Sequence, residues 1–80
     1  MIWNNYGKEK SMVEVFKTNV EHPEQSELLI NQIICHIPNG IINFDLDDCD
    51  KILRIEAKRI SNQAVIDLLN KNGFYAEVLI

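Results

Sequence analysis

The 80-residue sequence is short of the residues on which several specialised small folds depend. Its two cysteines, Cys35 and Cys49, are too few for the disulfide framework of a small secreted domain. Its three glycines form no glycine-rich loop of the kind that binds phosphate. No apolar run reaches the roughly 18 residues that a membrane-spanning helix needs, and no signal-like apolar stretch follows Met1. We therefore expect a cytoplasmic protein with no membrane partner.

Positive charge is also scarce. Eight Lys and Arg residues stand against 12 Asp and Glu residues, which gives a formal net charge of −4 at pH 7. Because nucleic acids bind to positively charged surfaces, this balance argues against a nucleic-acid partner. The sequence also shows no Ser/His/Asp or Cys/His arrangement that pairs a nucleophile with a base, so we expect no enzymatic activity.

A chain of this size has room for one hydrophobic core. Hydrophobic residues make up 46% of the sequence and charged residues 25%, values that are typical of a globular domain. Because a domain this short buries only about 60% of its unfolded surface, an exposed sheet face would gain from a partner. A homodimer and a complex with another protein both stay open.

The sequence begins with a polar segment, residues 1–11, that shows no hydrophobic periodicity. We predict that it forms a flexible N-terminal tail, with Met12 as an alternative first residue. From Met12 onward, β-branched and aromatic residues alternate with polar ones, which predicts a half-buried strand. Two alternating sets compete for its inward face: Val13 and Val15, or Met12, Phe16 and Thr18.

The next stretch predicts an amphipathic helix that begins near Pro23. Proline suits the first helical turn because its missing N–H would have no partner there. At 100° per residue, one apolar face collects Ser26, Leu29, Ile30, Ile33 and Ile37, with Ile34 at its edge. Leu28 and Cys35 point the opposite way, and the turn at residues 38–40 ends the helix.

The stretch NFDLDDCDKILRIE, residues 43–56, predicts a β-hairpin. If Asp47 lies opposite Ile52, one face carries three apolar pairs: Leu46 with Leu53, Phe44 with Ile55, and Ile42 with Ala57. The other face then carries two polar pairs: Asp45 with Arg54, and Asn43 with Glu56. This register leaves residues 48–51 as a four-residue hairpin loop.

A second helix and a last strand complete the pattern. Ser61 is a suitable N-cap, and Gly73 stands where a left-handed residue ends many helices. The apolar face of this helix comprises Ala64, Val65, Leu68 and Leu69. The closing FYAEVLI alternates as a strand does. The order over residues 12–80 is β-α-β-β-α-β, which predicts an α+β, ferredoxin-like domain: a four-stranded antiparallel sheet with two helices on one face.

Several short motifs resemble the heavy-metal-associated (HMA) domains of copper chaperones and metal-transporting ATPases. They are TNV at residues 18–20, GII at residues 40–42 and, above all, LLNKNGFYAEVL at residues 68–79. The resemblance covers residues 12–80 and implies the same fold. It also implies a metal loop between the first strand and the first helix, where the family places GMxCxxC and binds Cu(I), or Zn(II) in some members, through two thiolates.

In this chain the matching loop is NVEHPEQ, residues 19–25, which contains no cysteine. By the resemblance, Val20 takes the place of the methionine, His22 that of the first cysteine and Gln25 that of the second. Soft metal ions are selected by thiolate ligands, so we do not expect the chaperone activity of the family here.

A rebuilt metal site is the alternative. In this fold the first strand–helix loop, the hairpin tip and the turn before the last strand share one pole. That pole would collect His22, Asp48, Cys49, Asp50, Lys71 and Phe74. One His, one Cys and two carboxylates are chemically sufficient for Zn(II) or a similar ion, although a solvated acidic loop tip explains the same residues.

Two functions follow. The first is a non-enzymatic HMA-like domain that has lost thiolate metal binding, needs no cofactor and acts as a protein-interaction or regulatory module. The second is a metal-binding or metal-sensing protein that holds Zn or Cu around His22 and Cys49, with Asp48 and Asp50 as further ligands. Both depend on a loop that keeps its place and lacks its cysteines.

Overall fold

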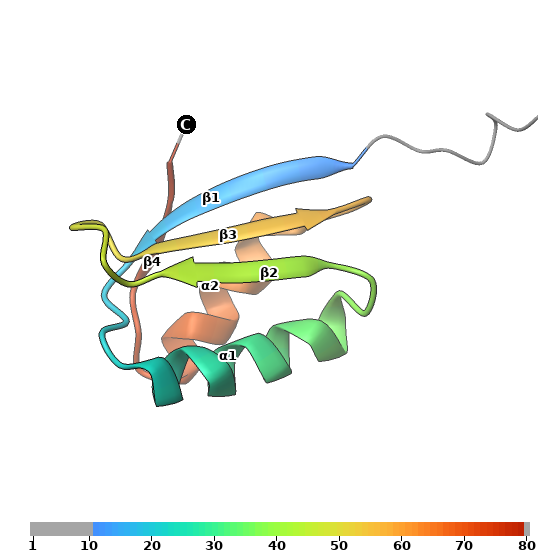
Figure 1. The fold of residues 1–80 in the computed structure, drawn as a ribbon. Helices are drawn as coiled ribbons and strands as arrows, with labels where there is room; N and C mark the ends of the chain where they lie inside the picture. Colours follow the sequence, from blue (N-terminus) through green and yellow to red (C-terminus); the bar gives the residue numbers. More distant parts are fainter. Residues whose placement is uncertain (1–10, 80) are drawn as a thin grey trace, which may run out of the picture.

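The computed structural model of the protein describes residues 11–79. The predicted N-terminal tail, residues 1–11, lies outside this range except for Ser11, and so does Ile80. Figure 1 shows one four-stranded antiparallel sheet with both helices on the same face, which confirms the predicted ferredoxin-like α+β fold. The six elements are β1 (Met12–Thr18), α1 (Pro23–His36), β2 (Ile41–Asp45), β3 (Ile52–Ala57), α2 (Asn62–Lys71) and β4 (Ala76–Leu79).

The sheet has the strand order β2-β3-β1-β4, so β1 and β3 are central and β2 and β4 form the edges. Of the two alternating sets predicted for β1, the one that contains Phe16 and Thr18 faces the core. Both of these residues are buried, whereas Val13 of the other set is 46% exposed. Phe16 lies opposite Leu53 of β3 on one side and Val78 of β4 on the other. This pairing places the first strand at the centre of the core.

Helix α1 follows its predicted boundaries and buries the predicted face. Ser26, Leu29 and Ile33 are buried, and Ile30, Ile34 and Ile37 are partly buried against the core. Gly40 closes the turn after the helix by donating its N–H to the Ile37 carbonyl at 3.0 Å. A Cβ atom on Gly40 would lie 2.7 Å from Ile37 Cγ2, so the turn packs too closely for a larger residue.

The β2–β3 hairpin differs from the predicted register by two residues. Phe44 lies opposite Leu53, Ile42 opposite Ile55 and Asp45 opposite Ile52. The ladder ends at Asp45, and the tip therefore spans residues 46–51. Because the shift is an even number, each side chain keeps its predicted face. Ile42, Leu53 and Ile55 are buried, so the apolar face is confirmed although its partners are wrong.

The physical reason for the longer tip is its aspartates. Asp45 Oδ1 accepts a hydrogen bond from the Asp47 N–H at 3.3 Å, and Asp48 Oδ1 accepts one from the Asp50 N–H at 2.8 Å. Such side-chain bonds to nearby backbone compete with the strand ladder and favour turns. Lys51 closes the tip in the left-handed region, with a φ of 48°. The tip is thus two successive turns rather than one short loop.

Helix α2 and β4 complete the core. The Ser61 hydroxyl accepts a hydrogen bond from the Ala64 N–H at 3.3 Å, which confirms Ser61 as the N-cap. Gly73 has a φ of 88° and confirms the predicted left-handed helix end. Val65, Leu68 and Leu69 are buried as predicted, but Ala64 is exposed because it lies at the margin of the apolar face.

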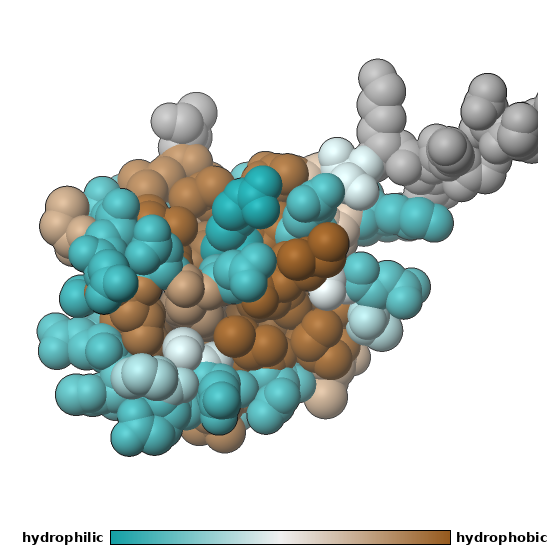
Figure 2. Space-filling view, viewed as in Figure 1, coloured by the Kyte–Doolittle hydropathy of each residue, from teal (hydrophilic) through white to brown (hydrophobic). Residues whose placement is uncertain are grey.

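The uncovered side of the sheet carries both polar and apolar residues. The predicted polar residues of β2 and β3 are there, since Asn43 pairs with Arg54 at the outer edge. Several large apolar side chains accompany them: Val13 is 46% exposed, Ile41 56%, Tyr75 46% and Leu79 37%. Figure 2 shows further hydrophobic surface over β2 and along the seam between β2 and α1.

Candidate functional site

Three segments meet at the pole where β1 and β2 end. The Thr18 N–H donates to the Asp50 carbonyl at 3.0 Å, and the Thr18 hydroxyl donates to the Lys51 carbonyl, which joins the end of β1 to the hairpin tip. Asn19 Oδ1 accepts a hydrogen bond from the Tyr75 N–H at 2.8 Å, which joins the same loop to the start of β4. These bonds confirm that the first loop, the tip and the turn before β4 share one pole.

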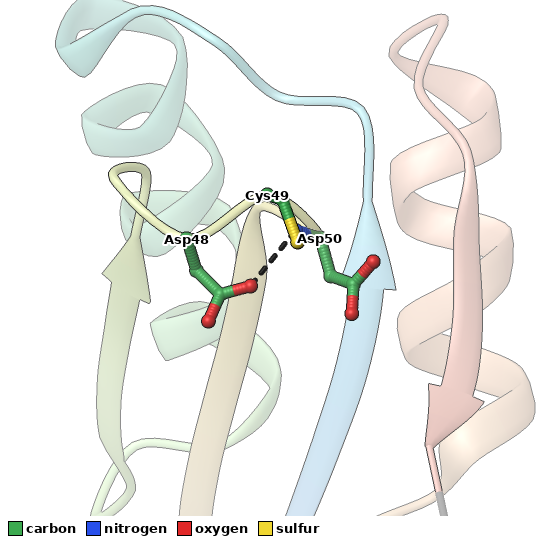
Figure 3. Close-up of side chains that lie close together, drawn as sticks. All are labelled: Asp48, Cys49 and Asp50. Atoms are coloured by element: carbon green, nitrogen blue, oxygen red, sulfur yellow. Dashed lines mark hydrogen bonds between the residues drawn. The ribbon is translucent and has the colours of Figure 1, made fainter.

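The hairpin tip brings together three of the four predicted metal ligands. The side chains of Asp48, Cys49 and Asp50 place their ligand atoms within 4.8 Å of one another. Figure 3 shows all three projecting from the tip, with the dashed hydrogen bond running from the Asp50 N–H to the Asp48 carboxylate. Asp48 and Cys49 are exposed, and Asp50 is partly exposed. The cluster is therefore a surface feature.

Both carboxylates of the cluster already have protein partners. Asp48 accepts the backbone N–H of Asp50, and Asp50 forms an ion pair with Lys17 at 3.7 Å. The ion pair is about half exposed and contributes little stability in water. A metal ion at the tip would compete with Lys17 for Asp50, and it would need at least one further ligand to complete tetrahedral coordination.

His22 is not part of this cluster. It is exposed and occupies the N-cap position of α1, where its carbonyl accepts hydrogen bonds from the Gln25 and Ser26 N–H groups at 3.0 and 3.1 Å. The backbone of His22 thus begins the helix. Its imidazole makes no capping hydrogen bond.

Gln25 and Val20 also have structural roles in the first loop. Gln25 Oε1 accepts the N–H of His22 at 3.2 Å, which is half of a capping box at the start of α1. Val20 is fully buried in the core, and its N–H donates to Thr18 Oγ1 at 3.2 Å. The positions that the family resemblance assigns to metal binding are therefore occupied by residues that build the helix start and the core.

Thr18 is the residue of this pole that sequence reasoning missed. Its hydroxyl donates to the Lys51 carbonyl and accepts the Val20 N–H, so one side chain joins the first loop to the hairpin tip. The only sequence signal was its alternation with Phe16 on the inward face of β1. A buried threonine at a strand end satisfies both bonds without exposing the core.

Tyr75 lies beside the same pole on the uncovered side of the sheet. Its hydroxyl donates a hydrogen bond to the Glu77 carboxylate. This bond favours the protonated phenol, and the negative charge of Glu77 opposes the phenolate, so the pKa of Tyr75 is raised above its ordinary value. Glu77 therefore makes the ionisation of Tyr75 less favourable.

Cys35 and Cys49 are both exposed free thiols. Cys35 lies one residue before the end of α1, and its sulfur donates weakly to the Asn31 carbonyl of the same helix at 3.4 Å. Cys49 lies at the hairpin tip. No disulfide joins Cys35 and Cys49.

Comparison with protein-family models, with curated proteins and with solved structures gives no match for this chain. The resemblance to HMA domains therefore stays a prediction from the motifs of the sequence. None of the helices in the described part of the chain is both long enough and apolar enough to cross a membrane.

Proposed function

We propose that the protein is a non-enzymatic, HMA-like domain that has lost the thiolate metal site and acts as a protein-interaction or regulatory module. The observation that supports this most is the use made of the first loop. Val20 is fully buried and Gln25 caps α1, so two of the three positions that match the family's metal motif are committed to folding. The third, His22, presents one imidazole and no thiolate.

The uncovered face of the sheet is the surface best suited to a protein partner. Val13, Ile41 and Leu79 come from three strands and expose 37% to 56% of their surface. Charged residues accompany them: Glu56 of β3 lies between Ile41 and Val13, and Lys17 lies opposite Glu77 nearer the hairpin tip. A mixture of apolar and charged groups is typical of interfaces between proteins that also exist apart.

We propose a cytoplasmic location for the protein. In the reducing cytoplasm, Cys35 and Cys49 would stay thiols.

Affinity capture with a matched surface variant tests this function. The immobilised protein should retain a specific partner, or a second copy of itself, that the Val13→Lys/Leu79→Lys variant does not retain. Sedimentation velocity on both forms separates self-association from binding to another protein. Equal capture by the two forms, together with a monomeric wild type at all concentrations, would refute the interaction role.

A metal-binding or metal-sensing function is the second candidate, because Asp48, Cys49 and Asp50 place three ligand atoms within 4.8 Å of one another. Zn(II) and Cu(I) are the ions to test under reducing conditions, on the wild type, His22→Ala and Cys49→Ser. Stoichiometric submicromolar binding that Cys49→Ser abolishes would establish this function, and its loss in His22→Ala would add the imidazole to the site. No binding by the wild type would eliminate it.

A further inference from the structure

A small apolar cavity opens between the two helices, away from the hairpin tip. It has a volume of about 240 Å³ and lies between the last turns of α1 and the first turns of α2. Its lining includes Ile33, His36, Arg59, Ala64, Val65 and Leu68. Figure 1 shows the two helices on the same side of the sheet.

Side-chain hydrogen bonds join the two helices outside the lining of the cavity. Gln32 and Asn72 exchange side-chain hydrogen bonds of 3.2 and 2.8 Å, which hold the middle of α1 against the end of α2. In the described chain no comparable bond joins α1 to the start of α2. Three residues of the core, Ile33, Val65 and Leu68, therefore form the inner wall of the cavity.

The rim of the cavity is basic in a chain that is acidic overall. Arg59 and His36 line it, whereas none of the 12 Asp and Glu residues does. Each of the two neighbouring grooves adds one basic and one acidic residue, Lys58 with Glu56 and Lys71 with Asp67, so the excess of basic residues belongs to the cavity itself. Among the side chains of residues 11–79, Lys17 forms an ion pair with Asp50 at the hairpin tip and Arg59 forms none. An apolar interior with the Arg59 side chain in its lining fits an amphipathic anion.

We propose that this cavity binds a medium-chain aliphatic carboxylate. The hydrocarbon body lies against Ile33, Val65 and Leu68, and the carboxylate pairs with the Arg59 guanidinium, which offers a planar fork of donors. An apolar cavity of about 150 Å³ accepts a six-carbon ring, so one of about 240 Å³ suits a body of roughly eight to ten carbons. This inference is independent of the function proposed above.

A titration of the ¹⁵N-labelled full chain with decanoate, followed by amide chemical shifts, tests the proposal. Saturable shifts are expected in the second half of α1, at residues 59–61 and in the first half of α2. Arg59→Gln should weaken the affinity about tenfold, because a charge-assisted hydrogen bond is lost. Arg54→Gln, which makes the same charge change on the uncovered sheet face, should leave the affinity unchanged.

Two further titrations, one with a second variant and one with an uncharged ligand, test the shape and the charge of the site separately. Ala64→Phe places a ring at the exposed margin of the cavity and should abolish binding, with folding verified by the dispersion of the amide spectrum. Decanol, which lacks the charge, should bind about tenfold more weakly than decanoate. Equal affinity for decanol, equal loss in Arg54→Gln, or no saturable shifts would overturn the proposal. Contacts between Trp3 and Val65 in the unliganded chain would assign the cavity to residues 1–10 instead and would also overturn it.

Discussion

The first loop and the hairpin tip lie at the same pole but use their residues differently. In the first loop, Val20 is buried and Gln25 caps a helix, so these two side chains face inward or bind backbone. In the tip, Asp48 and Cys49 are exposed, and the aspartates bond the backbone of the tip itself. The Thr18 side chain connects the two through its bonds to Lys51 and Val20.

The two regions show that the position of a loop in the fold does not determine what its side chains do. The first loop keeps the place that the HMA resemblance assigns to a metal loop, yet its residues now stabilise the fold. The tip gathers metal-binding residue types, yet exposure and local hydrogen bonds give it a sufficient structural explanation. Substitutions should therefore reduce stability at the first loop and leave it nearly unchanged at the tip.

The largest stability effect should come from Val20→Ala. Removing two methyl groups from a fully buried side chain should lower the free energy of unfolding by about 2 kcal/mol, through lost burial and a new cavity. Cys49→Ala is the matched change at the exposed tip and should stay within about 0.5 kcal/mol of the wild type. Urea unfolding followed by circular dichroism measures both. A larger loss at Cys49 than at Val20 would reverse the comparison.

Thr18→Val tests the connection between the two regions. The isosteric change removes the hydroxyl that bonds the Lys51 carbonyl and the Val20 N–H. We expect a loss of about 1.5 kcal/mol, since two backbone groups near the core lose their partner. Hydrogen exchange should show the Val20 amide exchanging faster than the global loss of stability explains. An unchanged Val20 amide would mean that Thr18 does not hold the loop.

Gln25→Ala should have a smaller effect because the residue is only partly buried. The helix start loses the bond from the His22 N–H to Gln25 Oε1, and we expect a loss of about 0.5 kcal/mol. Gln25→Glu is the control, since it keeps an acceptor and adds negative charge at a helix N-terminus. It should match or exceed the wild type in urea unfolding. Equal losses in both variants would exclude a capping role.

The smallest effect concerns the ionisation of Tyr75, measured by ultraviolet absorbance in a Tyr6→Phe background. Glu77→Gln should lower the pKa of Tyr75 toward its ordinary value of 10.0, because the carboxylate that raises it is removed. A raised folded pKa stabilises the fold below the unfolded pKa, and this contribution is lost as the pH rises through the folded pKa. Identical titrations in the two forms would show that the Tyr75–Glu77 bond does not persist in solution.

Hydrophobic periodicity predicted most of the fold, because it reports which face of each element is buried. The inward faces of α1 and of the hairpin were predictable for this reason, and Ser61 and Gly73 marked the ends of α2. The hairpin register was not, since a shift of two residues preserves every face. Only the local bonds of Asp45 and Asp48 decide it, and these compete with the ladder in a way that alternation does not show.

The candidate site was predictable only in part. Fold topology was sufficient to place the first loop and the tip at one pole. The structure does not bring His22 into the cluster of Asp48, Cys49 and Asp50, because its backbone is committed to the start of α1. The cavity beside Arg59 had no signal in the sequence, since it depends on how far apart two helices lie.

The most direct test of the first loop's origin is a Cu(I) titration of a His22→Cys/Gln25→Cys variant. Both this variant and its control carry Cys35→Ser and Cys49→Ser, and a competing chromophoric chelator reports binding under reducing conditions. We predict one tightly bound Cu(I) per chain in the variant and none in the control, because the variant has two thiolates at the positions that the resemblance assigns to the family's cysteines. If the folded variant takes no more Cu(I) from the chelator than the control does, the result would contradict the proposed relationship to HMA domains.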